Sequence, residues 1–431
     1  MDSLPPKLVK ATPRDSALRF SGNKILLIFN EFIELKSPND EIIISPYPEK
    51  QPLITSNLKT ISIKLKDSLL PNTTYTIDFG HSIADINEGN ILKDLSYTFS
   101  TGNNLDMHSL NGRVWMAESG KADSTMWALL YKEEEDSTVA KKKPSYVARV
   151  NGKGFFQFSN LPQGRYYVYA LKDADGNKKY NQPIEAFAFY DKPVDIPNDT
   201  SRLHLYAFAV EKEKKRERSG EMKKTDKISF TSNVQDGVLE LMDTVSIQFS
   251  ERLSFLDTNA FFLKEDSSGF KKISAIRKDT SHKKVYVMAD YKPGSQYQLM
   301  LSKAFAKDSS GRTLSKNDTL RFRVKTEKEY GSLKLSFQQL DMSKNPVIQL
   351  LQNEQLIYHN AMRQNDFFLK LAKPGSYQLQ ILYDLNGNGM WDTGDYFSKP
   401  RHQPEIVQFI DKEIVIKQNW DNEFEITLPL Y

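Results

Sequence analysis

The sequence contains no cysteine. This absence excludes disulfide bonds, thiol nucleophiles and thiolate metal sites. Long apolar runs are missing too, since no stretch approaches the roughly 18 consecutive apolar residues of a membrane helix. The opening letters "MDSLPPKLVK" are polar from the second residue and do not have the pattern of a signal peptide. We therefore expect a soluble chain, and an export segment removed from in front of "DSLPP" is equally compatible with this opening.

Patterns of catalytic and nucleic-acid-binding proteins are also scarce. The six histidines form no H-E-x-x-H or H-x-H arrangement, and neither a G-x-S-x-G elbow nor a Walker glycine loop occurs. The 59 basic and 55 acidic residues nearly balance, which argues against a partner bound through its phosphates. We predict no enzyme, no catalytic residue, no cofactor-binding residue and no nucleic-acid partner. A pair of carboxylates at long range, as in glycoside hydrolases, is the alternative that spacing alone does not exclude.

What the chain does contain is short strand patterns. Hydrophobic residues make up 39% of the 431, with 25 Phe and 20 Tyr, which is enough to bury several cores. Segments such as "KILLIFNEF", "TISIKLKD" and "KVYVMAD" are rich in β-branched and aromatic residues and mostly alternate. Turn residues separate them at roughly ten-residue spacing. The predicted fold class is all-β, as tandem β-sandwich modules in an elongated array.

The chain also repeats itself at long range. "LPNTTYTI" (70–77) is echoed by "KPGSQYQL" (292–299), and "GFFQFSNLPQGRYYVYALKDADGN" (154–177) by "DFFLKLAKPGSYQLQILYDLNGN" (366–388). Two kinds of module, A and B, therefore alternate along the chain. The predicted boundaries are 1–103 (A1), 104–210 (B1), a charged linker at 211–227, 228–328 (A2) and 329–431 (B2).

Two further stretches carry predictions about packing. "RYYVYAL" (165–171) is apolar on both faces, which favours a central, buried strand over a ligand platform. "YKEEEDSTVAKKKPSY" (131–146) is typical of a long charged hairpin loop.

The stretch "YDLNGNGMWDTGDY" (383–396) resembles a calcium-binding loop. Its oxygen-bearing side chains fall at positions 1, 3, 5, 9 and 12 of such a loop, and Gly389 at position 6 permits the sharp bend. The predicted Ca²⁺ ligands are Asp384, Asn386, Asn388, the backbone carbonyl of Met390, Asp392 and Asp395. A metal-free turn rich in Asn-Gly steps is the alternative. In either case we expect the loop to be structural.

The first copy of this loop is plainer. Asp173, Asp175 and Asn177 keep positions 1, 3 and 5, but Lys178 replaces the glycine and Ile184 the closing acid. We therefore expect this loop to fold as a turn without an ion. Each loop leads to a Gln-Pro pair, and the second loop takes ten residues more to reach it.

The N-terminal hundred residues, from "DSLPPKLVKATPRDSALRFSGNKILLIFNEFIEL" to "LSYTFSTG", resemble the bacterial Ig-like domain of S-layer-protein type found in Bacteroidota lipoproteins. The segment "NGRVWMA…YNQP" is similar to the transthyretin-like module that follows in that family. "DLNGNGMWDTGDYFSKPRHQPEIVQF" and "NWDNEFEI" are similar to its C-terminal end. The resemblance implies an outer-membrane lipoprotein of the cell envelope, periplasmic or surface-exposed. Its only membrane contact would be an N-terminal lipid anchor that this chain lacks.

The family has no assigned enzymatic activity, so the resemblance implies a structural or binding scaffold for a protein partner. Three alternatives remain open. The first is a carbohydrate-binding lipoprotein of a glycan-uptake system, which predicts exposed aromatic residues. The second is an accessory subunit of an outer-membrane assembly or secretion machine, and the third is a β-sandwich hydrolase.

Overall fold

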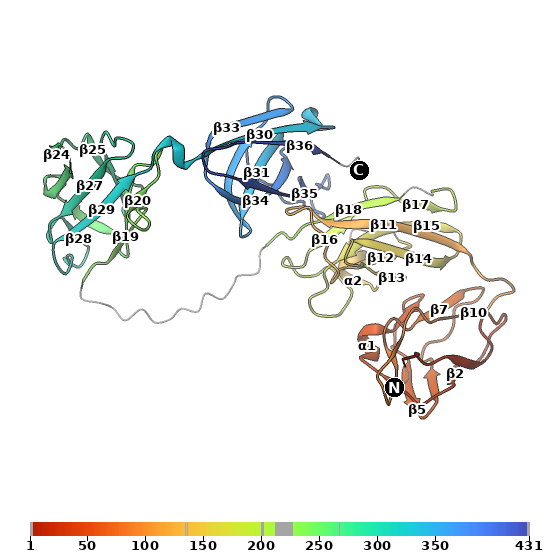
Figure 1. Ribbon diagram of the computed structural model, residues 1–431. Helices are drawn as coiled ribbons and strands as arrows, with labels where there is room; N and C mark the ends of the chain where they lie inside the picture. Colours follow the sequence, from red (N-terminus) through yellow and green to blue (C-terminus); the bar gives the residue numbers. More distant parts are fainter. Residues whose placement is uncertain are drawn as a thin grey trace.

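The computed structural model describes residues 3–133, 135, 137–199, 202–211, 227–266 and 268–428. The described part of the chain is almost entirely strands, with short helical turns between some of them, so the predicted all-β fold class of tandem β-sandwiches is confirmed (Figure 1). Residues 212–226 of the predicted linker lie outside the described residues. No helix among the described residues is long and apolar enough to cross a membrane.

Module A1 is a sandwich of two main sheets with a small third one. The sheet orders are β1-β2-β6-β5, β10-β7-β4 and β3-β8-β9. These strands are β1 (Leu8–Thr12), β2 (Lys24–Phe29), β3 (Ile33–Leu35), β4 (Ile43–Ser45), β5 (Leu53–Asn57), β6 (Thr60–Lys64), β7 (Thr74–Asp78), β8 (Ile83–Asp85), β9 (Ile91–Leu92) and β10 (Ser96–Ser100), with the short helix α1 (Pro38–Glu41) before β4. Alternate residues of β2 and β6 are fully buried, as expected for strands with one core face.

Module A2 repeats this order and adds β20 and β24 at the two edges of its second sheet. Its sheets run β19-β21-β26-β25 and β20-β29-β27-β23-β24, with β22 paired to β28. The strands are β19 (Phe230–Ser232), β20 (Val238–Leu239), β21 (Val245–Phe249), β22 (Leu253–Leu256), β23 (Phe261–Glu265), β24 (Gly269–Lys271), β25 (Ala275–Lys278), β26 (Lys284–Met288), β27 (Gln296–Leu301), β28 (Ala306–Asp308) and β29 (Asp318–Val324), with the 3-10 turn η1 (Thr258–Ala260) before β23. A1 and A2 therefore share one topology.

Modules B1 and B2 share a second topology, in which the last strand of each module joins its first strand in parallel. In B1 the sheets are β14-β11-β18 and β13-β12-β15-β16, and β17 also pairs with β15. The strands are β11 (His108–Met116), β12 (Trp127–Tyr131), β13 (Tyr146–Arg149), β14 (Phe155–Leu161), β15 (Gly164–Leu171), β16 (Phe187–Phe189), β17 (Val194–Ile196) and β18 (Leu203–Ala207), with helix α2 (Thr138–Lys141) between β12 and β13.

B2 has the corresponding sheets β33-β30-β36 and β32-β31-β34-β35. The strands are β30 (Gly331–Gln338), β31 (Pro346–Gln352), β32 (Gln355–Ala361), β33 (Asp366–Ala372), β34 (Gly375–Tyr383), β35 (Ile406–Ile416) and β36 (Asp421–Thr427), with 3-10 turns η2 (Glu327–Glu329) and η3 (Met342–Lys344). The long loop between β34 and β35 contains the predicted calcium motif.

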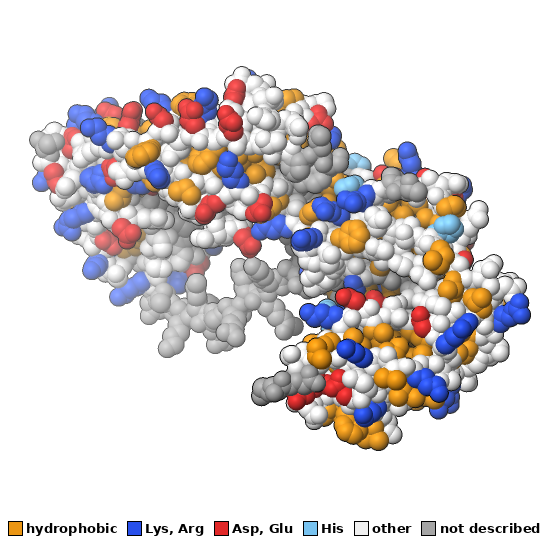
Figure 2. Space-filling model, turned by 45° about the vertical axis from the view of Figure 1, so that its right-hand side comes forward, with side chains coloured by type: hydrophobic (Ala, Val, Ile, Leu, Met, Phe, Trp, Pro, Cys, Tyr) orange, Lys and Arg blue, Asp and Glu red, His pale blue; other side chains and the backbone are white. Residues whose placement is uncertain are grey.

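The order of the modules in space differs from their order in the chain. Figure 1 shows B2 lying against B1, with A1 beyond B1 at one end and A2 beyond B2 at the other. The array is therefore A1–B1–B2–A2, whereas the chain runs A1–B1–A2–B2. On the face shown in Figure 2, acidic and basic side chains are scattered over the surface and neither sign forms a continuous patch.

The strand predicted to be central is central. β15 lies between β12 and β16, and its residues from Tyr166 to Leu171 are all buried. Tyr166, Val168 and Ala170 pack inside the B1 sandwich. Tyr167, Tyr169 and Leu171 belong to a second cluster on the outer face of the same sheet.

Candidate functional site

The second apolar cluster of B1 is closed by residues of B2. Tyr396, from the β34–β35 loop, is 1% exposed and packs among the aromatic rings of B1. Its ring meets those of Tyr169, Phe187 and Phe189 at centroid distances of 5.7, 5.1 and 5.2 Å. These edge-to-face contacts are the arrangement that aromatic quadrupoles favour. The loop therefore covers an apolar sheet face that would otherwise meet water.

Polar contacts hold the same loop at its edges. The hydroxyl groups of Tyr396 and Tyr169 are 3.2 Å apart, and the Thr393 hydroxyl donates to the Ala209 carbonyl at 3.2 Å. The side-chain amide of Gln403 donates to the Phe189 carbonyl at 3.1 Å. Beside the loop, the Val407 amide donates to the Ala117 carbonyl at 2.8 Å. Satisfied polar groups around an apolar centre give this contact the form of a specific interface.

Close backbone approach requires glycine in this loop. A Cβ added at Gly394 would lie 2.7 Å from the Phe208 ring and 2.8 Å from the His402 carbonyl oxygen. Position 394 therefore excludes any side chain while the loop stays seated on B1.

The predicted ligand Asp384 organises the calcium-type loop from its start. Its carboxylate is 2% exposed and accepts hydrogen bonds from the amides of Gly387, Asn388 and Gly389, at 2.7, 3.2 and 2.6 Å. The Asn386 and Asn388 side-chain amides each donate to the Asp392 carboxylate at 2.6 Å. The structure thus brings four of the predicted side chains together in one compact loop.

Asp395 is placed differently, and the position of the Met390 carbonyl stays a prediction. Asp395 accepts hydrogen bonds from the amides of Phe397 and Ser398, at 2.9 and 3.1 Å, and so caps a separate turn. The Met390 side chain is 66% exposed, and its amide donates to the Asn388 side chain at 2.7 Å.

A glutamate that was not among the predicted site residues lies beneath the Asp384 loop. Glu405 is 4% exposed and accepts hydrogen bonds from the amides of Leu385 and Asp392, at 2.8 and 3.1 Å. Burial raises the pKa of this carboxyl group, and the Asp384 charge acts in the same direction. Glu185 has the same place in B1, where it accepts from the amides of Ala174 and Gln182. The signal in the sequence is the acid that follows each Gln-Pro pair.

The B1 loop carries its own cation. The Lys178 ammonium lies 2.7 Å from the Asp173 carboxylate, whose side chain is 1% exposed, and 4.3 Å from the centre of the Trp127 ring. Carboxylate oxygens of Asp173, Asp175 and Glu185 all lie within 4.8 Å of one another, an arrangement that can hold a metal ion. In B2 the position of Lys178 is taken by Gly389. At position 6 the two loops therefore differ in whether a lysine neutralises the first aspartate.

The four tryptophans bear on the carbohydrate-binding alternative, which predicts exposed aromatic residues, and they differ in exposure. Trp420 is 62% exposed, and Trp115, Trp127 and Trp391 are half-buried. The Trp391 indole donates to the Glu405 carbonyl at 2.7 Å, which fastens the calcium-type loop to the body of B2.

Residues 2–101 match the model of a bacterial Ig-like domain. This confirms the predicted identity of module A1. No curated protein matches the chain.

Among solved structures, the Bacillus anthracis TIE protein is 13% identical and aligns over 99% of this chain and 76% of its own, with a TM-score of 0.18. The major pilin subunit BcpA of Bacillus cereus is 10% identical over 74% of this chain and 98% of its own, also with a TM-score of 0.18. The N-terminal part of the bacterial S-layer protein SbsC is 14% identical. It aligns over 48% of this chain and 45% of its own, with a TM-score of 0.17. These TM-scores are too low for a shared arrangement of whole chains.

The Ig-like module A1 is tied directly to B1. The Tyr47 amide donates to the Ser145 carbonyl at 2.7 Å, and Arg149 of B1 lies 3.9 Å from the Glu41 carboxylate of A1. Ile43 and Tyr47 pack against the outer apolar cluster of B1. A1 and the B2 loop therefore cover the same sheet of B1.

At the other end, A2 is tied to B2 around one carboxylate. Glu240 of A2 accepts from Lys325 at 2.8 Å and from the Tyr330 hydroxyl at 2.5 Å, and lies 3.7 Å from Lys373 of B2. Desolvation opposes ionisation of Glu240, but these partners outweigh it and lower its pKa. The short turn η2 is held by Glu329, which pairs with Arg323 through bonds of 2.6 and 2.8 Å.

Proposed function

We propose that this protein is a non-catalytic scaffold of the bacterial cell envelope, in which a paired B1–B2 core holds two Ig-like end modules in fixed positions. The observation that carries the proposal is the burial of Tyr396 of B2 in the aromatic cluster of B1. An interface this apolar joins modules more firmly than a flexible linker does. Each end module then touches its neighbouring B module through the contacts of Tyr47 and Glu240.

Such a scaffold acts through geometry. Rigid sandwiches present exposed loops and sheet edges, which is where proteins with these folds usually bind partners. The partner proposed here is a protein that contacts the end modules. The match of A1 to a bacterial Ig-like domain supports an envelope location. The finer proposals rest on resemblance: an outer-membrane lipoprotein of the Bacteroidota, with transthyretin-like B modules and a lipid anchor ahead of the N-terminal segment.

We further propose that Ca²⁺ binds the Asp384 loop as a structural ion. Support comes from the comparison of the two loops, because B1 places the Lys178 ammonium against its buried first aspartate and B2 has glycine there. A hard divalent cation suits the carboxylate and amide oxygens of Asp384, Asn386 and Asp392. The ion would stiffen the same loop that carries Tyr396 to B1.

Capture of partners from the native envelope tests the scaffold role. The full-length protein, with its native N-terminal region, is expressed in its own cells, and the cells are fractionated. We expect the protein in the envelope fraction and bound to a protein partner. We also expect Tyr396→Ala, which weakens the contact between B1 and B2, to release that partner. Recovery in the cytoplasmic fraction, or a turnover of substrate by the purified protein, would contradict the proposal. Capture of a glycan or of an assembly machine would instead favour the alternative functions.

A further inference from the structure

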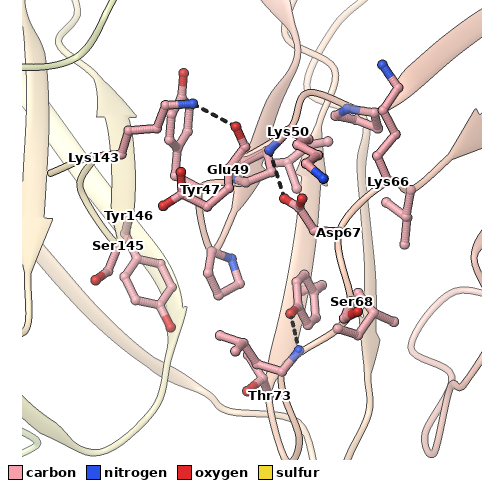
Figure 3. A pocket seen from close by; sticks show the side chains of 18 of the residues that line it. Tyr47, Glu49, Lys50, Lys66, Asp67, Ser68, Thr73, Lys143, Ser145 and Tyr146 are labelled. Carbon is pink, nitrogen blue, oxygen red and sulfur yellow. Dashed lines mark hydrogen bonds between the residues drawn. The ribbon is translucent and has the colours of Figure 1, made fainter.

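A cavity of about 480 Å³ lies between the Ig-like module A1 and module B1. This volume is within the range of small-molecule sites, which occur preferentially between modules. One wall comes from the segments around Tyr47 and Asp67 of A1, and the other from the β12–β13 loop of B1, around Ser145 (Figure 3).

Hydrogen bonds across the junction hold the two walls together. The Tyr47 amide donates to the Ser145 carbonyl at 2.7 Å, and the Lys143 ammonium donates to the Glu49 carbonyl at 2.8 Å. On the A1 side, the Lys50 amide donates to the Asp67 carboxylate at 2.9 Å. Figure 3 shows the last two of these bonds near each other in the upper part of the view. The cavity is therefore a built feature of the junction.

The inner part of the cavity is apolar. Ile44, Leu65, Leu69 and Pro144 line it. Tyr146, which is 2% exposed, adds to this lining. Most small-molecule sites have a lining of this kind.

The mouth of the cavity carries positive charge. Lys50, Lys66, Lys132 and Lys143 line it, whereas Glu49 and Asp67 are the acidic residues among its described lining. The ammonium groups of Lys50, Lys66 and Lys132 form no ion pair within the described part of the chain. Asp67 is already engaged by the Lys50 amide. Lysines gathered around a cavity mouth raise the local concentration of anions.

We propose that the A1–B1 cavity binds an amphipathic organic acid, with its apolar body against Leu65, Leu69 and Pro144 and its carboxylate among the lysines of the mouth. Such a ligand matches the apolar interior and the lysines of the rim together. The cavity lies at the A1–B1 junction, which the scaffold role also uses. The lysines of its mouth take no part in the B1–B2 contacts described above, so their charges can be changed without altering that interface.

The test uses the full chain and a fluorescent amphipathic anion, anilinonaphthalene sulfonate, whose emission rises in apolar sites. Phenylpropionate and laurate are then added as competitors, each beside its uncharged amide. We expect the acids to displace the dye and the amides to do so about tenfold less well. Equal displacement by an acid and its amide would overturn the proposal.

Charge-matched variants locate the site. Lys50→Glu with Lys66→Glu reverses two charges at the mouth, and Lys10→Glu with Lys93→Glu reverses two exposed charges elsewhere on A1. We expect about tenfold weaker dye binding in the first pair only, with melting temperatures unchanged in both. The same affinity in both pairs would overturn the proposal.

Discussion

The hydroxyl groups of Tyr169 and Tyr396 lie 3.2 Å apart, although 227 residues separate them in the chain. Tyr169 belongs to the central strand of B1 and Tyr396 to the longest loop of B2. Their contact explains why β15 is apolar on both faces: one face packs inside its own sandwich, and the other packs against the second half of the chain. A duplicated pair of modules has thereby become one four-module unit.

Removing the Tyr396 ring should separate the halves. Tyr396→Ala leaves a cavity in the aromatic cluster, and we expect it to destabilise the B1–B2 contact by about 3 to 5 kcal/mol. Urea unfolding followed by tryptophan fluorescence should then split into an earlier and a later transition. The control is Trp420→Ala, since Trp420 is 62% exposed and its loss should change stability by less than about 0.5 kcal/mol. Equal effects of the two variants would contradict this role of Tyr396.

Calcium should stabilise B2 through the Asp384 loop. We expect added Ca²⁺ to raise the melting temperature, chelator to reverse the gain, and Asp384→Ala to abolish it, because Asp384 is the buried first ligand of the loop. Asp411→Ala, an exposed aspartate of the same module, should keep the gain. A melting temperature of the intact protein that is unaffected by chelator would rule the ion out.

The first loop should depend on its lysine. Lys178→Gly copies the B2 residue and leaves the Asp173 carboxylate, 1% exposed, without its cation. Breaking a buried ion pair costs about 3 to 5 kcal/mol, so we expect a large loss of B1 stability. We also expect Ca²⁺ to restore part of it through Asp173, Asp175 and Glu185. Thermal melting with and without Ca²⁺ measures both effects, and a variant as stable as the parent would disprove the substitution of lysine for metal.

The A2–B2 junction should weaken in acid. The bidentate bond from Arg323 lowers the pKa of Glu329 to about 2, from an ordinary value of 4.5. A depressed carboxyl pKa stabilises the folded state above the ordinary value, and that stabilisation is lost as the pH falls from about 4.5 towards about 2. We therefore expect Glu329→Gln to be less stable than the parent at neutral pH, with the difference shrinking across this range.

Melting curves at several pH values measure this difference. Glu327→Gln serves as the control, because the Glu327 side chain is 65% exposed and pairs with Lys370 at only 3.9 Å. A constant difference between Glu329→Gln and the parent at all pH values would contradict the assigned pKa.

Local patterns predicted much of this fold. The alternating strands, the repeated modules and the burial of "RYYVYAL" follow from residue type and spacing, because burial on one or two sheet faces leaves a direct trace in the sequence. The compact loop around Asp384 was predictable for the same reason. Its oxygens follow one another at the spacing that turns them inward.

Contacts between residues of different modules could not be predicted from local sequence patterns. Tyr396 reads as part of a turn, and only its contact with Tyr169 makes it a core residue of another module. Glu405 lies after the loop that it supports, so its role depends on where β35 begins. The spatial order of the modules could not be derived either, since it depends on which exposed apolar face each loop covers.

If the B1–B2 interface is rigid, it holds the two end modules at a fixed separation. Because the chain has no native cysteine, Ser56→Cys in A1 and Ser310→Cys in A2 allow two spin labels to be placed at exposed sites. Pulsed electron spin resonance then measures the distance between the labels. We expect one narrow distance distribution in the parent protein and a broader one in Tyr396→Ala. A distribution already broad in the parent, or one that Tyr396→Ala leaves unchanged, would contradict a rigid B1–B2 interface.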